Sequence, residues 1–123
     1  MTNTETMRPK VWAVVVWKLQ HGTFVALRTV DETIAPVDCR LTTSQTPGQA
    51  ADTVTQNSMG VTVSGWTELP ARAGLHLMVS TVTEAPIDLG SEANWIDVDQ
   101  LPLLSAFTPG FDLVTLYLAL QQL

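Results

Sequence analysis

The sequence predicts an α+β domain in which helices sandwich a mixed β-sheet. The expected elements run strand, strand, helix, strand, strand, strand, helix. Helices inserted between runs of strands favour a mixed sheet over regularly alternating strands and helices. A length of 123 residues fits one unit, so we expect a solvated tail at residues 1–9 and a single domain at residues 10–123.

β-Branched and aromatic residues predict a hairpin at the start of this domain. VWAVVVW at residues 11–17 and FVALRTV at residues 24–30 have strand propensity, and Gly22 supplies the turn between them. Trp12 and Trp17 are an odd number of positions apart, so they face opposite sides of one strand, and one of them is a candidate for exposure. Residues 31–45 lack a regular period, and we expect a loop whose middle touches the sheet.

A capped helix is predicted at residues 47–59. The Thr46 hydroxyl suits the N-cap and Pro47 the first helical position. Gly60 suits a left-handed C-cap. The apolar residues that recur at helical spacing are Ala50, Ala51 and Val54.

Three more strands and a closing helix complete the prediction. The strands are expected in VTVSGWTEL, LHLMVSTVTEA and ANWIDV, and Asp99 is expected to cap a single turn over QLPLL. Pro109 and Asp112 are expected to open the last helix, FDLVTLYLALQQL. Its apolar face comprises Leu113, Leu116, Tyr117 and Leu120.

Composition excludes several classes of function. Twelve acidic residues against six basic ones give a net charge of −6 without a basic cluster, which argues against nucleic-acid binding. Cys39 is the single cysteine, so we expect no intrachain disulfide and a cytoplasmic location. The apolar run at residues 11–17 is too short to span a membrane. His21 and His76 lack the spacing of a metal-binding pair.

At residues 46–63, TPGQAADTVTQNSMGVTV, the sequence resembles the Nudix family. That family's signature is Gly, five residues, Glu, seven residues, then Arg-Glu-apolar-any-Glu-Glu-any-Gly-apolar, and its last two positions match Gly60 and Val61. The opening hairpin VWAVVVWKLQHGTFVALR and the segment SEANWIDVDQLPLL are also similar to family segments, in the expected order. The resemblance implies a Nudix-like α/β/α sandwich with a mixed sheet.

The signature's charged residues are all replaced. In the family, these glutamates hold divalent cations that bridge a diphosphate and ready a water for attack, and such cations require clustered oxygen ligands. Aligned on Gly60, the first glycine is Cys39. The charged positions are Gln45, Thr53, Val54, Asn57 and Ser58, which makes the Nudix box degenerate.

We therefore expect a pseudoenzyme that has lost metal-dependent pyrophosphohydrolase activity, with no metal cofactor. It would act by binding a protein partner, including itself as a homodimer, or a nucleotide-like ligand. By resemblance, Arg28 and Arg40 lie near the expected cleft, and Phe107 is a candidate to stack on a flat ligand.

The alternative is a divergent Nudix hydrolase of nucleoside diphosphate-linked compounds. It would use Mg²⁺ or Mn²⁺ held by acids outside the box. Asp88 and Glu92 lie in the loop where some family members keep an additional base, and Glu92 is the candidate substitute acid.

Overall fold

A computed structural model describes residues 9–20, 22–30, 33–42, 44–71, 73–82, 89, 93–103 and 113–121. Its first two strands are β1 (Lys10–Leu19) and β2 (Gly22–Val30), which form the predicted antiparallel hairpin. The first strand begins at Lys10. The tail expected at residues 1–9 lies outside the described residues except for Pro9, whose carbonyl accepts a hydrogen bond of 2.9 Å from the Leu41 N–H.

The described strands form one seven-stranded mixed sheet with β1 near its centre. β1 pairs in parallel with β6 (Leu75–Val82), whereas the other strand pairs are antiparallel. β5 (Thr67–Leu69) continues the sheet beyond β6, and β7 (Ala93–Asp97) pairs with β2. The mixed sheet that the sequence predicted is therefore confirmed.

The segment predicted as a loop, residues 31–45, contains two short strands, and its middle contacts the sheet as expected. β3 (Thr33–Ala35) pairs with β2, and β4 (Val37–Arg40) pairs with the start of β1. Pro36 separates the two strands, since proline has no N–H to donate to a ladder. Both strands are short and irregular in sequence. β3 pairs with the end of β2, the strand that precedes it in the chain, whereas β4 pairs with the start of β1, which is distant in sequence.

Two other local predictions need correction. The strand expected from Val61 is confined to β5, although Val61 itself is buried in the core. Residues 98–103 form a 3-10 helix, η1 (Val98–Leu103), but its start is capped by Asp97, whose Oδ1 accepts a hydrogen bond of 2.9 Å from the Asp99 N–H. The predicted cap, Asp99, is the donor because the turn begins two residues earlier than expected.

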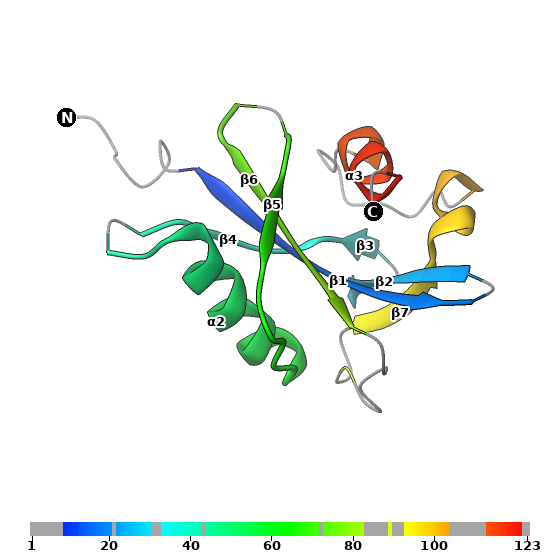
Figure 1. The fold of residues 1–123 in the computed structure, drawn as a ribbon, viewed down its shortest axis with the longest axis horizontal. Coiled ribbons are helices and arrows are strands. Elements are labelled where there is room, and N and C mark those ends of the chain that lie inside the picture. The colour runs from blue at the N-terminus through cyan, green and yellow to red at the C-terminus, as the bar shows by residue number, and fades with distance from the viewer. Residues whose placement is uncertain are drawn as a thin grey trace.

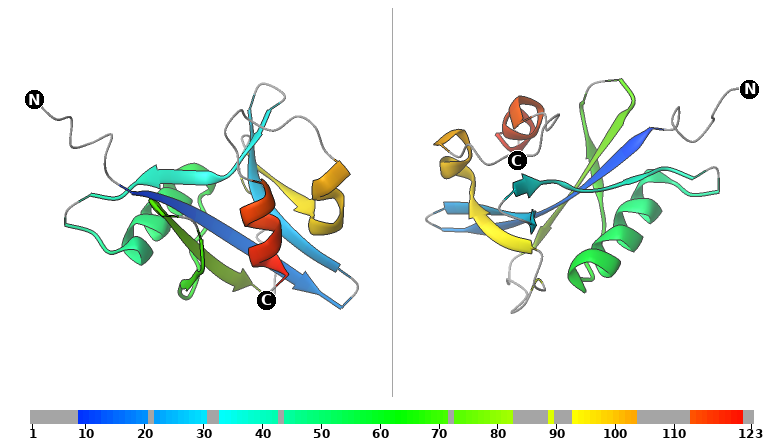
Figure 2. Two further views of the ribbon diagram at one scale, coloured as in Figure 1. Left: turned by 90° about the horizontal axis from the view of Figure 1, so that it is seen from above. Right: turned by 180° about the vertical axis from the view of Figure 1, so that it is seen from behind.

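Helices cover both faces of the sheet (Figure 1). α2 (Pro47–Met59) lies on one face, and η1 with α3 (Leu113–Leu120) lies on the other, which the reverse view shows again (Figure 2). We call these the α2 face and the α3 face. No helix in the described ranges has the length and apolarity to cross a membrane.

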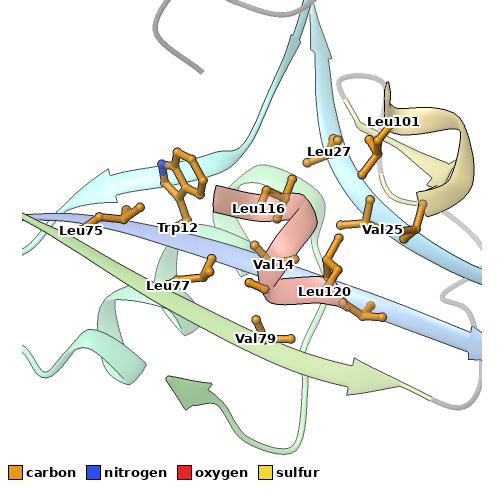
Figure 3. Close-up of a cluster of buried hydrophobic side chains, with 13 residues drawn as sticks. Trp12, Val14, Val25, Leu27, Leu75, Leu77, Val79, Leu101, Leu116 and Leu120 are labelled. Carbon is orange, nitrogen blue, oxygen red and sulfur yellow. The ribbon is translucent and has the colours of Figure 1, made fainter. Parts of the chain in front are cut away.

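On the α3 face, even-numbered residues of β1 pack beneath the last helix. Leu116 and Leu120 of α3 lie over Val14 of β1, and Leu101 of η1 closes the cluster beside Leu27 (Figure 3). The apolar face predicted for this helix is thus confirmed at Leu116 and Leu120, both buried. The burial of these leucines holds α3 on the sheet because apolar surface is removed from water.

On the α2 face, odd-numbered residues of β1 pack beneath α2. Val11, Ala13 and Val15 are fully buried in this second cluster. Trp12 and Trp17 accordingly lie on opposite faces, as predicted, but neither is exposed: Trp12 is buried and Trp17 is half-buried. α2 and the residue two positions after it contribute four buried residues to this cluster: Ala50, Ala51, Met59 and Val61.

Candidate functional site: the α2 face

The start of α2 is fixed by a capping box. The Thr46 side chain accepts a hydrogen bond of 3.2 Å from the Gln49 N–H, and the Gln49 Oε1 accepts one of 3.0 Å from the Thr46 N–H. These bonds satisfy amides that the first turn of a helix leaves without partners. At the other end, Gly60 adopts φ 67° and its N–H donates to the Gln56 carbonyl. The sequence prediction of this helix is confirmed at both ends.

The inner side of α2 carries small or apolar residues. Ala50, Ala51, Thr55 and Met59 are buried against β1, β4 and β6. Cys39, at the position of the signature's first glycine, packs on the same helix, and its thiol donates a weak hydrogen bond of 3.8 Å to the Ala50 carbonyl. This contact ties β4 to the first turns of α2.

The positions that the resemblance assigns to the signature divide between solvent and core. Thr53 and Asn57 are exposed, whereas Ser58 is half-buried. Val54 is half-buried and packs against the apolar cluster of the α2 face. Gln45 precedes the helix, where its Oε1 accepts a hydrogen bond of 2.9 Å from the Thr42 hydroxyl.

The one acidic residue of α2, Asp52, bonds within its own helix. Its Oδ2 accepts a hydrogen bond of 3.2 Å from Nε2 of Gln56, one turn later. Among the described residues, no group of three or more His, Cys, Asp or Glu side chains lies close enough together to hold a metal ion. Asp88, Glu92, Phe107 and His21 lie outside the described residues.

Burial controls the chemistry of the single cysteine. Removal from water, with the carboxylate of Asp38 as the lesser cause, raises the pKa of the Cys39 thiol above its ordinary value of 9.0. The thiol is therefore protonated near neutral pH, and a protonated thiol is a poor nucleophile and a poor metal ligand.

The histidine within β6 is engaged with an acid of the neighbouring strand. Nδ1 of His76 lies 2.9 Å from Oε2 of Glu68 on β5, and both side chains are partly exposed. The contact joins the short edge strand β5 to β6, which agrees with a structural role for this histidine.

The two candidate arginines project from different faces of the sheet. Arg28 on β2 is paired with Ala93, a member of the α2-face cluster. Arg40 on β4 is paired with Lys10, one position from Val11, so it projects from the α3 face. Directly opposite residues share a face in an antiparallel pair, and only Arg28 is therefore on the side of α2.

Sequence reasoning missed an aromatic cluster on the α2 face. Ring centroids of Trp17 and Trp95 are 5.6 Å apart, as are those of Trp17 and Phe24. The register that joins them is not visible in the sequence, although the odd position of Trp17 in β1 was a usable signal. Four buried donors have no hydrogen-bond partner among the described residues: Nε1 of Trp17, Trp66 and Trp95, and the hydroxyl of Thr55.

No protein-family model and no curated protein matches this chain. Several solved structures, however, are similar to it in fold. The NUDIX domain of Shewanella oneidensis NrtR, crystallised with ADP ribose, has a TM-score of 0.72 at 12% identity, covering 99% of this chain and 98% of that chain. RenU, a Nudix hydrolase from M. smegmatis, has a TM-score of 0.69 at 17% identity, covering 94% and 84%.

A third similar chain comes from the complex between the C-terminal domain of mouse MUTYH and human PCNA. Its TM-score is 0.59 at 15% identity, covering 92% of this chain and 88% of that chain. Likeness at such low identity establishes architecture rather than activity. The chain has the Nudix fold, an α/β/α sandwich around a mixed sheet, as the sequence resemblance implied.

Proposed function

We propose that this chain is a Nudix-fold binding protein that has lost metal-dependent pyrophosphate hydrolysis. The observation that carries the proposal is Val54. It occupies a position where the signature has a glutamate, and its side chain packs against the apolar cluster beneath α2. An isopropyl group offers no lone pair to a cation, and this one packs against apolar side chains rather than beside other oxygen ligands.

The neighbouring positions support the same conclusion on grounds of charge. Mg²⁺ and Mn²⁺ bind to several hard oxygen ligands, of which carboxylates offset the positive charge. Thr53, Asn57 and Ser58 are neutral, and Asp52 is bonded to Gln56. α2 therefore presents one carboxylate where the family's mechanism uses several.

For the binding partner, we favour another protein chain, including a second copy of this one. Val114 and Leu118 of α3 are 66% and 60% exposed, and they lie one helical turn apart on the same side. Residues 113–123 have no charged side chains, so two chains of net charge −6 can approach there with little local repulsion between side chains.

The alternative partner is a nucleotide-like ligand. The similar NUDIX domain of NrtR was crystallised with ADP ribose, and the similar MUTYH domain was crystallised with a protein, PCNA. The Nudix fold is thus found with either type of partner, and the two have to be separated by experiment.

Metal binding and turnover test the loss of catalysis. Calorimetric titration with Mn²⁺ is expected to give no tight binding, and incubation with ADP-ribose and Mg²⁺ or Mn²⁺ is expected to release no product. Steady metal-dependent hydrolysis that Glu92→Gln abolishes would instead establish the divergent hydrolase.

Sedimentation across a range of concentrations tests self-association. The native chain is expected to form a dimer that Leu118→Asp dissociates, because the new charges would be buried against each other. Thr53→Asp, which places the same charge on exposed α2, is the matched control and should dimerise normally. A native chain that is monomeric throughout would exclude self-association.

A further inference from the structure

The outer side of α3 is apolar, unlike the outer side of α2. Among the described residues, three large apolar side chains are exposed, and two of them, Val114 and Leu118, lie on α3. We refer to these two side chains, which are 66% and 60% exposed, as the α3 patch. The exposed residues of α2, by contrast, are all polar: Gln49, Thr53, Gln56 and Asn57.

The inner side of α3 is apolar as well. Leu116, Ala119 and Leu120 are buried, and Leu116 and Leu120 lie over the sheet (Figure 3). A helix that is apolar on both sides is typical of one that is covered on both sides. In the described part of this chain only the inner side is covered, so the α3 patch is suited to contact with another molecule.

The distribution of charge favours a second copy of this chain as that molecule. Residues 113–123 have no charged side chains, so the α3 patch offers nothing that would select a charged partner. Each chain has a net charge of −6, and two copies repel each other where their acidic residues face. An uncharged apolar patch is therefore where two copies can meet with little repulsion.

A two-fold axis makes the α3 patch complementary to itself. Val114 and Leu118 are one helical turn apart on α3, and in a two-fold contact residue i meets residue j while j meets i. When the two helices are antiparallel, each valine lies against the leucine of the other copy. The last turn of α3 has no basic residue, and antiparallel pairing brings the positive N-terminal end of the other helix beside it.

We propose that α3 pairs in antiparallel orientation with α3 of a second copy, so that Val114 of each chain contacts Leu118 of the other. This assignment rests on the protein-binding form of the proposed function, and it names the partner and the arrangement. Two side chains from each copy make a small contact beside the roughly 800 Å² per chain that a standard interface buries. The dimer is therefore weak, and its population depends on protein concentration.

Salt distinguishes this contact from one held by ion pairs. Salt screens the repulsion between two chains of net charge −6 and leaves an apolar contact in place. Raising NaCl from about 0.05 M to about 0.5 M is expected to tighten the native dimer severalfold in sedimentation experiments. A dimer that weakens severalfold instead would be held by charged groups, which contradicts pairing through the α3 patch.

A charge swap tests the arrangement itself. Val114→Lys and Leu118→Asp each place a charge against an apolar side chain of the second copy, so each variant alone is expected to be monomeric. An equal mixture places lysine against aspartate at one contact and keeps valine against leucine at the other. A labelled Leu118→Asp chain is therefore expected to sediment as a heterodimer only when Val114→Lys is present. Parallel helices would leave both charges against apolar side chains.

Thr53→Lys is the matched control for the mixture. It adds the same charge at an exposed position of α2, so the mixture with Leu118→Asp has the same net charges without a lysine at the α3 patch. The labelled Leu118→Asp chain is expected to stay monomeric there. Because Val114 and Leu118 are exposed, the variants should unfold thermally much as the native chain does. Val114→Asp with Leu118→Lys is the reciprocal pair if one variant fails to fold.

Two further results would overturn the proposal, and they have different consequences. A labelled chain that stays monomeric with Val114→Lys, at concentrations where the native chain dimerises, excludes α3 pairing but keeps self-association. A native chain that is monomeric throughout excludes both. The loss of hydrolysis stands in either case, because the metal and turnover measurements judge it separately.

Discussion

Arg28 and Arg40, the two basic side chains expected near a ligand, project from opposite faces of the same sheet. Arg28 is paired with Ala93 beneath the α2 face, and Arg40 is paired with Lys10 on the other side. Two arginines so placed cannot clamp one diphosphate together. Of these two arginines, only Arg28 can therefore contact a nucleotide-like ligand on the α2 face.

The two arginines are expected to differ in a binding experiment. Arg28→Gln should weaken ADP-ribose binding about tenfold or more, because a hydrogen bond to a charged group contributes about 1.5–3 kcal/mol. Arg40→Gln, the matched control, should bind within about twofold of the native chain. Calorimetry measures both, and equal losses from the two substitutions would contradict the assignment of faces.

Thr55→Val is expected to stabilise the protein. Thr55 is fully buried in α2, and its hydroxyl has no hydrogen-bond partner among the described residues. Valine has nearly the same shape without the hydroxyl, so its substitution should raise the free energy of unfolding by about 1 kcal/mol. Denaturant unfolding measures this change. Thr53→Val on the exposed side of the same helix should change stability little, and a destabilised Thr55→Val would imply an acceptor for the hydroxyl.

The two ends of α2 predict opposite effects of glycine-to-alanine substitution. Gly60 has φ 67°, where a Cβ is strained, so Gly60→Ala should lower the free energy of unfolding by about 1 kcal/mol. Gly48 lies in the first turn, and a Cβ there would meet no atom within 4 Å. Gly48→Ala should be neutral or stabilising by up to about 1 kcal/mol. Thermal unfolding of the pair checks the signs, and a harmless Gly60→Ala would contradict the left-handed cap.

Alkylation of Cys39 is expected to be slow and to depend on pH. Burial, together with Asp38, raises the pKa of this thiol above 9.0, so the folded protein should react with iodoacetamide more slowly at pH 8 than a free cysteine does. The rate should rise with pH and level off at a higher pH than it does for a free cysteine, because the thiolate is the reacting form. Asp38→Asn should lower the pKa and accelerate the reaction modestly, and an unchanged rate would remove Asp38 as a cause.

The same pKa sets the sign of a stability effect. Since the folded pKa of Cys39 is raised, the unfolded chain ionises first as pH increases. The contribution of Cys39 to stability is thus constant below its unfolded pKa and declines as pH rises through the folded one. Cys39→Ser should remove this part of the alkaline decline, which pH-dependent denaturant unfolding would measure.

The sequence by itself determined the elements whose strand propensity, turn residues or capping residues lie within one short stretch. The opening hairpin has β-branched residues around Gly22, and α2 has Thr46, Pro47 and Gly60 at its ends, so both were predictable from short stretches. The sequence likewise shows that no charged residue stands at the positions that the resemblance aligns with the charged residues of the signature. This chain can share a fold with NrtR and RenU at low sequence identity because the fold depends on the pattern of apolar positions and turn residues. Many different sequences can have the same pattern.

Only tertiary structure decided which residues meet. β4 is a strand because it pairs with the start of β1, which is distant in sequence, and no local period predicts that pairing. Register likewise placed Trp95 against Trp17 and separated Arg28 from Arg40. The reason is that a strand alternates its side chains with a period of two, so a shift of one residue in pairing would exchange the faces.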